Sequence, residues 1–111
     1  FIEKRLKILD KMNFNLKKVW FDPGIGFGKT LNQNLQLMRS LSKYSHKNLQ
    51  ILLGSSRKSW INFIDPSNAD QRIGGSLASI THALQQNVNT FRIHDVQETN
   101  QMIKVLKALN K

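Results

Sequence analysis

Cysteine is absent from this sequence of 111 residues, and proline occurs only twice. The lack of cysteine excludes a disulfide framework, a zinc site built from thiolates and a cysteine nucleophile. Acidic residues are scarce, since 7 Asp and Glu stand against 17 Lys and Arg, for a formal net charge of +10. No apolar run approaches the roughly 18–20 residues that a membrane-spanning helix needs, and the layout of a signal peptide is missing. We therefore expect no membrane partner and a cytoplasmic location.

The residues that are present indicate one globular unit. A length of 111 residues allows one domain at most, and 40% hydrophobic with 22% charged residues is typical of a globular chain. The positive charge favours anionic partners but does not separate nucleic acid from phosphorylated metabolites or acidic lipid. The Lys residues are spread over helix faces without interleaved aromatics, so we expect no nucleic acid partner. The chain starts at Phe1 already in a helical pattern, which suggests a piece of a longer protein.

The hydrophobic pattern predicts helices that alternate with short apolar strands. Helices are expected over about 1–13, 32–44, from 59 to a break at 65–66, over 71–86, and from 96 onwards. Strands are expected over 19–21, 51–53 and 89–93. Each strand lacks polar alternation, as parallel strands covered on both faces do, so the pattern predicts an α/β fold. Three strands are too few to close a barrel and would leave two open edges.

Each predicted strand is followed by a polar or glycine-rich loop, at residues 22–29, 54–59 and 92–95. In parallel α/β folds, ligands bind at the carboxyl ends of the strands, because loops and helix N-termini converge there. The connections at the opposite ends are ordinary polar segments. This asymmetry predicts a binding site at one rim of the sheet.

The first loop contains three glycines but does not match a nucleotide-binding motif. A P-loop would need glycine where Pro23 stands, and the third glycine comes one residue early for the dinucleotide fingerprint. We interpret the segment as a mobile loop that carries Phe27 over a ligand, with a plain connector as the alternative. Its glycines are Gly24, Gly26 and Gly28.

Asp22 directly follows the first strand, so we expect its carboxylate to be partly desolvated. A carboxylate there could accept two hydrogen bonds from a planar edge such as that of Arg or of a 2-aminopyrimidinone. It could equally form an Asx turn, because Asp-Pro-Gly is a strong turn sequence. The residues leave both alternatives open.

The second loop joins a strand to a helix. Gly54 permits close approach of a ligand, and the hydroxyls of Ser55 and Ser56 could cap the helix that follows. The helix N-terminus, together with Arg57 and Lys58, favours a carboxylate or a phosphate. The alternative is a capped helix with solvated basic residues.

The third loop carries a basic pair. If the strand continues that far, alternation sends Arg92 and His94 to one side and Ile93 to the other. Such a pair suits a diphosphate, with Asp95 orienting the His94 ring. Alternatively, Asp95 caps the last helix together with Glu98. Two other histidines are assigned to the surface or to helix packing: His46 and His82.

Taken together, residues 22–29, 54–59 and 92–96 resemble the C-terminal half of the bacterial dihydropteroate synthase family, and residues 72–78 resemble the family's helix after the lysine loop. The likeness covers nearly the whole chain, in order and with similar spacing. It implies that residues 1–111 are the C-terminal portion of a pterin-binding (β/α)8 TIM barrel, which needs roughly 250 residues. The chain would hold about strands six to eight with their helices, incomplete without an absent N-terminal half.

The resemblance also implies a reaction and a role for each matching residue. The family joins 6-hydroxymethyl-7,8-dihydropterin diphosphate to 4-aminobenzoate in folate biosynthesis, without a protein nucleophile. The pterin would be bound by Asp22, Lys58 and Arg92, and the diphosphate by Arg92, Ile93 and His94. The 4-aminobenzoate, at the site that sulfonamides occupy, would be bound by Phe27, Arg57, Lys58 and Ser59. Supporting loop positions would be Gly24, Gly26, Gly28, Gly54 and Ser56.

The resemblance further implies partners and a cofactor. Magnesium would be bound in the absent N-terminal half, so no metal ligand is assigned here. A homodimer through the C-terminal helices is expected, and the segment alone is expected to be inactive. Three alternatives remain: a pterin-binding methyltransferase domain, which should lack the Ser-Arg-Lys and Arg-x-His loops; a non-catalytic basic binding module; and a degenerate non-enzyme that retains the rim.

Overall fold

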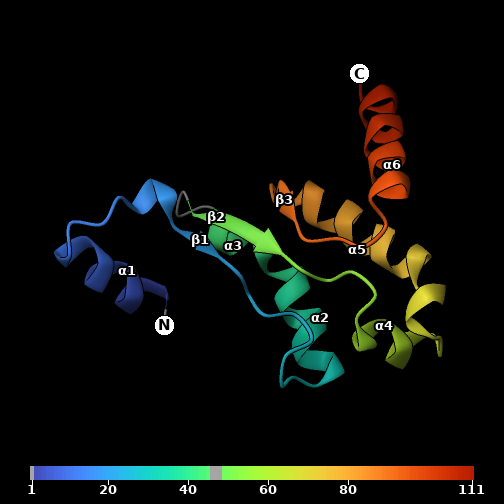
Figure 1. Ribbon diagram of the computed structural model, residues 1–111, viewed down its shortest axis with the longest axis horizontal. Helices are drawn as coiled ribbons and strands as arrows, with labels where there is room; N and C mark the ends of the chain where they lie inside the picture. The colour runs from blue at the N-terminus through green and yellow to red at the C-terminus, as the bar shows by residue number, and fades with distance from the viewer. Residues whose placement is uncertain (1, 46–48) are drawn as a thin grey trace.

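The computed structural model describes residues 2–45 and 49–111, in which helices alternate with the strands of a small parallel sheet (Figure 1). The strands are β1 (Trp20–Phe21), β2 (Gln50–Leu53) and β3 (Thr90–Phe91). The helices are α1 (Ile2–Lys11), α2 (Leu31–Arg39), α3 (Leu41–Ser45), α4 (Ser59–Ile64), α5 (Ile73–Gln85) and α6 (Val96–Leu109), with 3-10 turns η1 (Leu16–Lys18) and η2 (Ala69–Gln71). The predicted alternation of helices and strands is confirmed. Within the described ranges, no helix is both long and apolar enough to cross a membrane.

The three strands form one sheet in the order β1-β2-β3. Both pairings are parallel, with Trp20 opposite Gln50 and Leu52 opposite Thr90. The predicted parallel sheet is therefore confirmed, and β1 and β3 are its edges. In Figure 1, α1 lies beyond the β1 edge and α6 projects from the other side of the molecule.

The burial of the strands differs from the sequence-based expectation. On β2, Ile51 and Leu53 share one face and are buried, whereas Leu52 on the other face is half-buried. Trp20 on β1 is 51% exposed. The prediction that every strand is covered on both faces is wrong for β1, because the described part of the chain leaves Trp20 largely uncovered. Both residues of β3 are half-buried. The core lies between β2 and helices α2 to α5 and consists of Ile25, Met38, Leu41, Ile51, Leu53, Trp60, Ile61, Ala83 and Val88.

The single helix expected over 32–44 is divided at Ser40 into α2 and α3. The side chain of Gln86, which follows α5, explains the break. Its Nε2 donates to the Met38 carbonyl at 2.6 Å, and its Oε1 accepts from the Ser42 backbone N–H at 3.0 Å. His82 lies on α5 with Nε2 3.0 Å from the same carbonyl, which confirms a packing role, whereas His46 falls outside the described residues.

Helices α4 and α5 approach each other closely at Gly75. A Cβ atom at this position would lie 2.6 Å from Cγ2 of Ile61. At the neighbouring Gly74, a Cβ atom would meet no heavy atom within 4 Å. The close approach therefore requires glycine at position 75 and not at position 74.

We expect Gly75→Ala to destabilise the protein, although alanine is favoured over glycine in helices by about 1 kcal/mol. The added methyl group would overpack the contact with Ile61, which typically costs about 1–3 kcal/mol. Gly74→Ala is the matched control and should leave stability unchanged or raise it slightly. The free energy of unfolding in urea measures both effects, and equal stabilisation by the two variants would contradict the packing.

Candidate functional site

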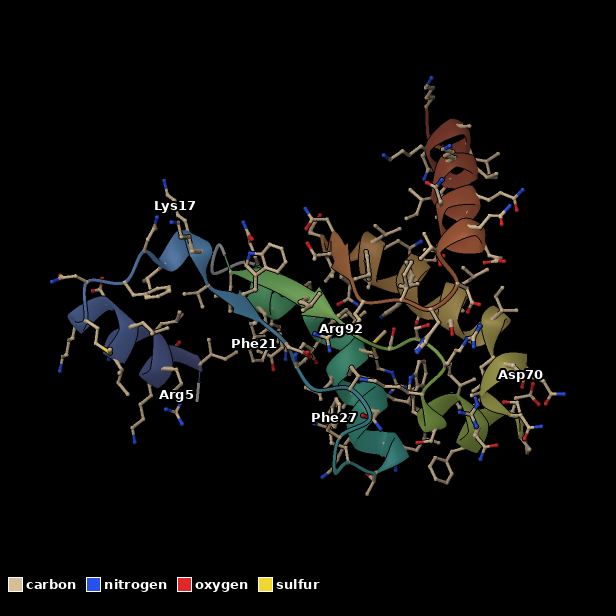
Figure 2. All side chains as sticks on the ribbon, viewed as in Figure 1. Arg5, Lys17, Phe21, Phe27, Asp70 and Arg92 are labelled. Atoms are coloured by element: carbon tan, nitrogen blue, oxygen red, sulfur yellow. The ribbon has the colours of Figure 1, made fainter. Side chains whose placement is uncertain are left out.

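The loops that follow β1, β2 and β3 meet at the carboxyl edge of the sheet, and Lys58 contacts the first of them. In the structure, the first loop covers residues 22–30, the second loop 54–58 and the third loop 92–95, so the bounds of the first two differ by one residue from the predicted ones. The Lys58 Nζ donates to the Ile25 carbonyl at 2.6 Å and lies 4.4 Å from the centre of the Phe27 ring. Figure 2 shows Phe27 on the first loop and Arg92 at the end of β3. The predicted convergence of the loops is present.

The charges around Lys58 come from the first and third loops. Burial lowers the pKa of Lys58 below its usual 10.5, the nearby charges of Arg92 and Lys29 lower it further, and Asp22 acts in the opposite direction. Desolvation disfavours the charged form of an amine, and neighbouring cations do the same. A bound anion would relieve both effects, so the arrangement favours anionic ligands.

Asp22 forms the turn that Asp-Pro-Gly predicts. Its Oδ1 accepts from the Gly24 backbone N–H at 2.8 Å, which confirms the Asx turn. The expected desolvation is wrong, because Asp22 is exposed beside the open edge strand. Whether its carboxylate also binds a ligand remains a prediction.

The rest of the first loop is fixed by further hydrogen bonds. The Gly26 N–H donates to the buried Asn34 side chain at 2.8 Å, and the Lys29 Nζ donates to the carbonyls of Gly24 and Phe27 at 2.7 and 3.0 Å. The Ile25 side chain is completely buried, whereas Phe27 is 66% exposed. The loop is therefore anchored at its base and presents Phe27 to solvent.

The serines of the second loop do not cap α4, contrary to the prediction. Both are buried: Ser55 Oγ lies 2.7 Å from Ser79 Oγ, and Ser56 Oγ lies 3.0 Å from Nδ1 of His94. Lys58 itself occupies the N-cap position, without a capping side-chain hydrogen bond. Ser59 is the exposed first residue of α4. The hydroxyls therefore connect the loop to α5 and to the third loop.

The third loop is built differently from the prediction. Strand β3 ends at Phe91, before the expected limit of residue 93. Asp95 neither orients His94 nor caps α6 with its side chain; instead it accepts two hydrogen bonds from Arg57, at 2.6 Å to Nη2 and 3.2 Å to Nε. This pair lowers the pKa of Asp95 and raises that of Arg57. A bidentate guanidinium is a stronger partner for the carboxylate than a backbone N–H.

The chemistry available at this edge is that of an anion site. Within the described part of the chain, no three His, Cys, Asp or Glu residues form a group that could hold a metal ion. Cations outnumber carboxylates near Lys58. These surroundings do not suit a hard divalent cation, because such ions prefer several oxygen ligands. The site as described can bind anions and planar polar groups.

Gly26→Ala should expel the Lys58 side chain from its place. The new Cβ would lie 2.9 Å from Cδ of Lys58, at a backbone φ of +87° that already favours glycine. Because burial is the main cause of the lowered pKa, we expect the pKa of Lys58 to rise toward 10.5 in this variant. NMR titration of the lysine side chains measures the change.

Gly28→Ala is the matched control, since its φ is +58° and its Cβ would meet nothing within 4 Å. It should strain the backbone locally and leave the pKa of Lys58 as it is. An unchanged Lys58 pKa in both variants would show that the contact with Gly26 does not hold this side chain.

Comparison with known proteins identifies a matching family model and similar curated proteins. Residues 1–94 match the family model described as pterin binding enzyme. Dihydropteroate synthase of Escherichia coli K12 is 40% identical over 92 residues, covering 83% of this chain and 33% of that protein. The Haemophilus influenzae enzyme of the same name is 35% identical over 108 residues, covering 97% and 39%. The chain thus spans about a third of the length of these curated relatives.

Solved structures agree with the sequence matches. The crystal structure of Yersinia pestis dihydropteroate synthase with a sulfonamide drug superposes with a TM-score of 0.92 at 34% identity, covering 99% of this chain and 40% of that chain. The structure from Xanthomonas albilineans in complex with 7,8-dihydropteroate gives 0.92 at 30% identity, covering 99% and 42%. The predicted resemblance is confirmed. On the match of residues 1–94, this chain belongs to the pterin-binding enzyme family.

Proposed function

We propose that this chain is the C-terminal part of a dihydropteroate synthase, supplying strands six to eight of a (β/α)8 barrel and their helices. The enzyme would join 6-hydroxymethyl-7,8-dihydropterin diphosphate to 4-aminobenzoate, giving dihydropteroate and diphosphate. The observation that carries the proposal is the meeting of three loops at Lys58, with Asp22 and Arg92 close enough to influence its charge.

The shape of the chain supports its being one part of a barrel. Its radius of gyration is 15.3 Å, larger than the roughly 13 Å of a compact domain of about this length. Large apolar side chains between residues 8 and 20 are exposed, namely Ile8, Met12, Phe14, Leu16 and Trp20. Preceding strands and helices of a barrel would pair with the open edge of β1 and cover these side chains.

The pterin is assigned to Asp22, Lys58 and Arg92. A carboxylate can accept two hydrogen bonds from the 2-aminopyrimidinone edge, and the exposed Asp22 lies at the mouth of the first loop. Lys58 would exchange its bond to the Ile25 carbonyl for one to the pterin. Arg92 would lie against the pterin ring with its guanidinium plane.

The diphosphate is assigned to Arg92, to Ile93 and to His94. Ser56 lies against Nδ1 of His94, so the proposal gives Nε2 to the diphosphate. Breaking the bond between the methylene carbon and the diphosphate oxygen places negative charge on the leaving group. Fixed cations at that point stabilise the transition state more than the ground state.

The 4-aminobenzoate is assigned to Phe27, Arg57, Lys58 and Ser59, beside the pterin. Its amine would attack the methylene carbon, forming the carbon–nitrogen bond as the carbon–oxygen bond breaks, and would lose a proton to solvent. Positioning of the two substrates, together with the cations at the leaving group, would accelerate the reaction without a protein nucleophile. Gly24, Gly26, Gly28, Gly54 and Ser56 would support these contacts.

Magnesium is assigned to residues outside this chain, because the groups near Lys58 do not suit it. No step of the reaction is therefore derived through the metal here. This assignment is tested by measuring the magnesium content of this chain alone and of a barrel completed with a relative's N-terminal part. Only the completed barrel should bind the metal.

We further propose a homodimer through the C-terminal helices. Helix α6 exposes Val96, Val105 and Leu109, the last at 73%. Leu109→Lys should shift a completed barrel from dimer to monomer in sedimentation velocity, because it introduces a charge into an apolar contact. Gln97→Lys adds the same charge to an exposed polar position of α6 and should leave the dimer intact. A monomeric parent protein would contradict the proposal.

A chimera tests the proposed activity. The N-terminal part of the Escherichia coli enzyme, up to the region aligned with this chain, is joined to residues 1–111. We expect the chimera to form dihydropteroate and the chain alone to form none. Arg92→Gln should lower the chimera's turnover by about 100-fold or more, as the loss of a transition-state donor does.

Arg39→Gln removes the same charge from an exposed position at the end of α2 and is the control. Circular dichroism establishes that each variant is folded. A folded chimera without activity, or full activity after Arg92→Gln, would contradict the proposal. Salt-sensitive binding of DNA instead of substrate would favour the basic binding module.

A further inference from the structure

The second and third loops are joined by side chains that continue the register of the sheet. In the sheet, Leu53 lies opposite Phe91, and the last backbone bond runs from the Arg92 N–H to the Leu53 carbonyl at 2.9 Å. Beyond the strands, Ser56 pairs with His94 and Arg57 pairs with Asp95. The partners in both pairs are 38 residues apart, as are Leu53 and Phe91. Two side-chain contacts thus extend the pairing of β2 and β3 into the site.

The backbone of Arg57 is held by contacts with Ser76 and Arg72. Its φ is +56°, a left-handed conformation that is uncommon for a residue other than glycine. Its N–H donates to Ser76 Oγ at 2.9 Å, and its carbonyl accepts from Nη1 of Arg72 at 2.8 Å. Arg72 is itself fixed, because its Nη2 donates to the Ser67 carbonyl at 2.6 Å. A strained conformation persists only where its surroundings determine it, as they do here.

Asp95 completes this arrangement from the third loop. It stands at the N-cap position of α6, yet its carboxylate makes no capping bond and binds the guanidinium in a bidentate manner. Its side chain is 13% exposed and that of Arg57 is 32% exposed, so the pair is largely shielded from solvent. Two parallel hydrogen bonds fix orientation as well as distance. Each partner is also next in sequence to a residue of the proposed site: Arg57 precedes Lys58, and Asp95 follows His94.

We propose that the Arg57–Asp95 pair is a positioning strut that sets the separation between Lys58 and the Arg92–His94 pair, so that one ligand can contact both loops. The inference rests on the proposed function for the identity of that ligand, a pterin bearing a diphosphate. Arg57 thereby has a positioning role in addition to its assignment to 4-aminobenzoate.

The test compares a ligand that spans the two loops with one that contacts only the third. The probes are the pterin diphosphate substrate and inorganic pyrophosphate, titrated calorimetrically into the chimera without 4-aminobenzoate. Asp95→Asn removes the charge but keeps the shape and an equally good N-cap residue, and Arg57→Lys removes the bidentate geometry. Glu98→Gln, an exposed position in the first turn of α6, is the control for charge.

We expect Asp95→Asn and Arg57→Lys each to raise the Kd of the pterin diphosphate by about tenfold while changing that of pyrophosphate by less than about twofold, since small misplacement of positioned groups is costly. The double variant should be no weaker than either single variant, because all three lack the same contact. The control should match the parent. The strut would be overturned by equal losses of affinity for both probes, by additive losses in the double variant, or by unchanged affinity for the pterin diphosphate.

If the chimera binds neither probe, the proposed function fails, but the strut can still be tested by a structural measurement. Crystal structures of the parent and of Asp95→Asn should then differ in the separation of Lys58 from His94. Loops that superpose in the two structures would overturn the strut irrespective of ligand.

Discussion

The ammonium group of Lys58 is where the three loops at the carboxyl edge of the sheet depend on one another. It bonds the Ile25 carbonyl, faces the Phe27 ring, and is close enough to Arg92, Lys29 and Asp22 for their charges to influence its pKa. An ammonium group that is partly desolvated among other cations is costly, and an anionic ligand offsets that cost. The same feature that lowers the pKa of Lys58 would therefore favour a ligand that carries negative charge.

This arrangement requires a parallel sheet. Only parallel strands present all their carboxyl ends at one edge, so that loops distant in sequence meet there. The loops are then held by contacts independent of any ligand: Ile25 is buried in the core, the Gly26 N–H is bound by Asn34, and Ser55 is bound by Ser79. These buried polar and apolar contacts hold the loops in place. They thereby keep the mutually repelling cations of the rim near each other.

Sequence reasoning predicted the parts of the molecule that depend on local pattern. The apolar runs located all three strands, Asp-Pro-Gly predicted the turn at Asp22, and the loops indicated the family.

Sequence patterns could not predict the contacts between distant residues. Asp95 was expected to orient His94 or to cap α6, because nothing near it in the sequence shows that Arg57 lies opposite. The break at Ser40 could not be predicted from the local sequence either, since it depends on the side chain of Gln86, which follows α5. The desolvation expected for Asp22 failed because burial at an edge strand depends on what covers that edge.

Lys58, Arg92 and Asp22 are proposed to bind one ligand together. A crystal structure of the completed barrel with the pterin diphosphate bound tests it most directly. We expect a single ligand molecule with its aminopyrimidinone edge on Asp22, its ring near Lys58 and its diphosphate on Arg92 and His94, each polar contact within about 3.2 Å. A ligand bound elsewhere, or one that reaches only one of the three loops, would contradict the account.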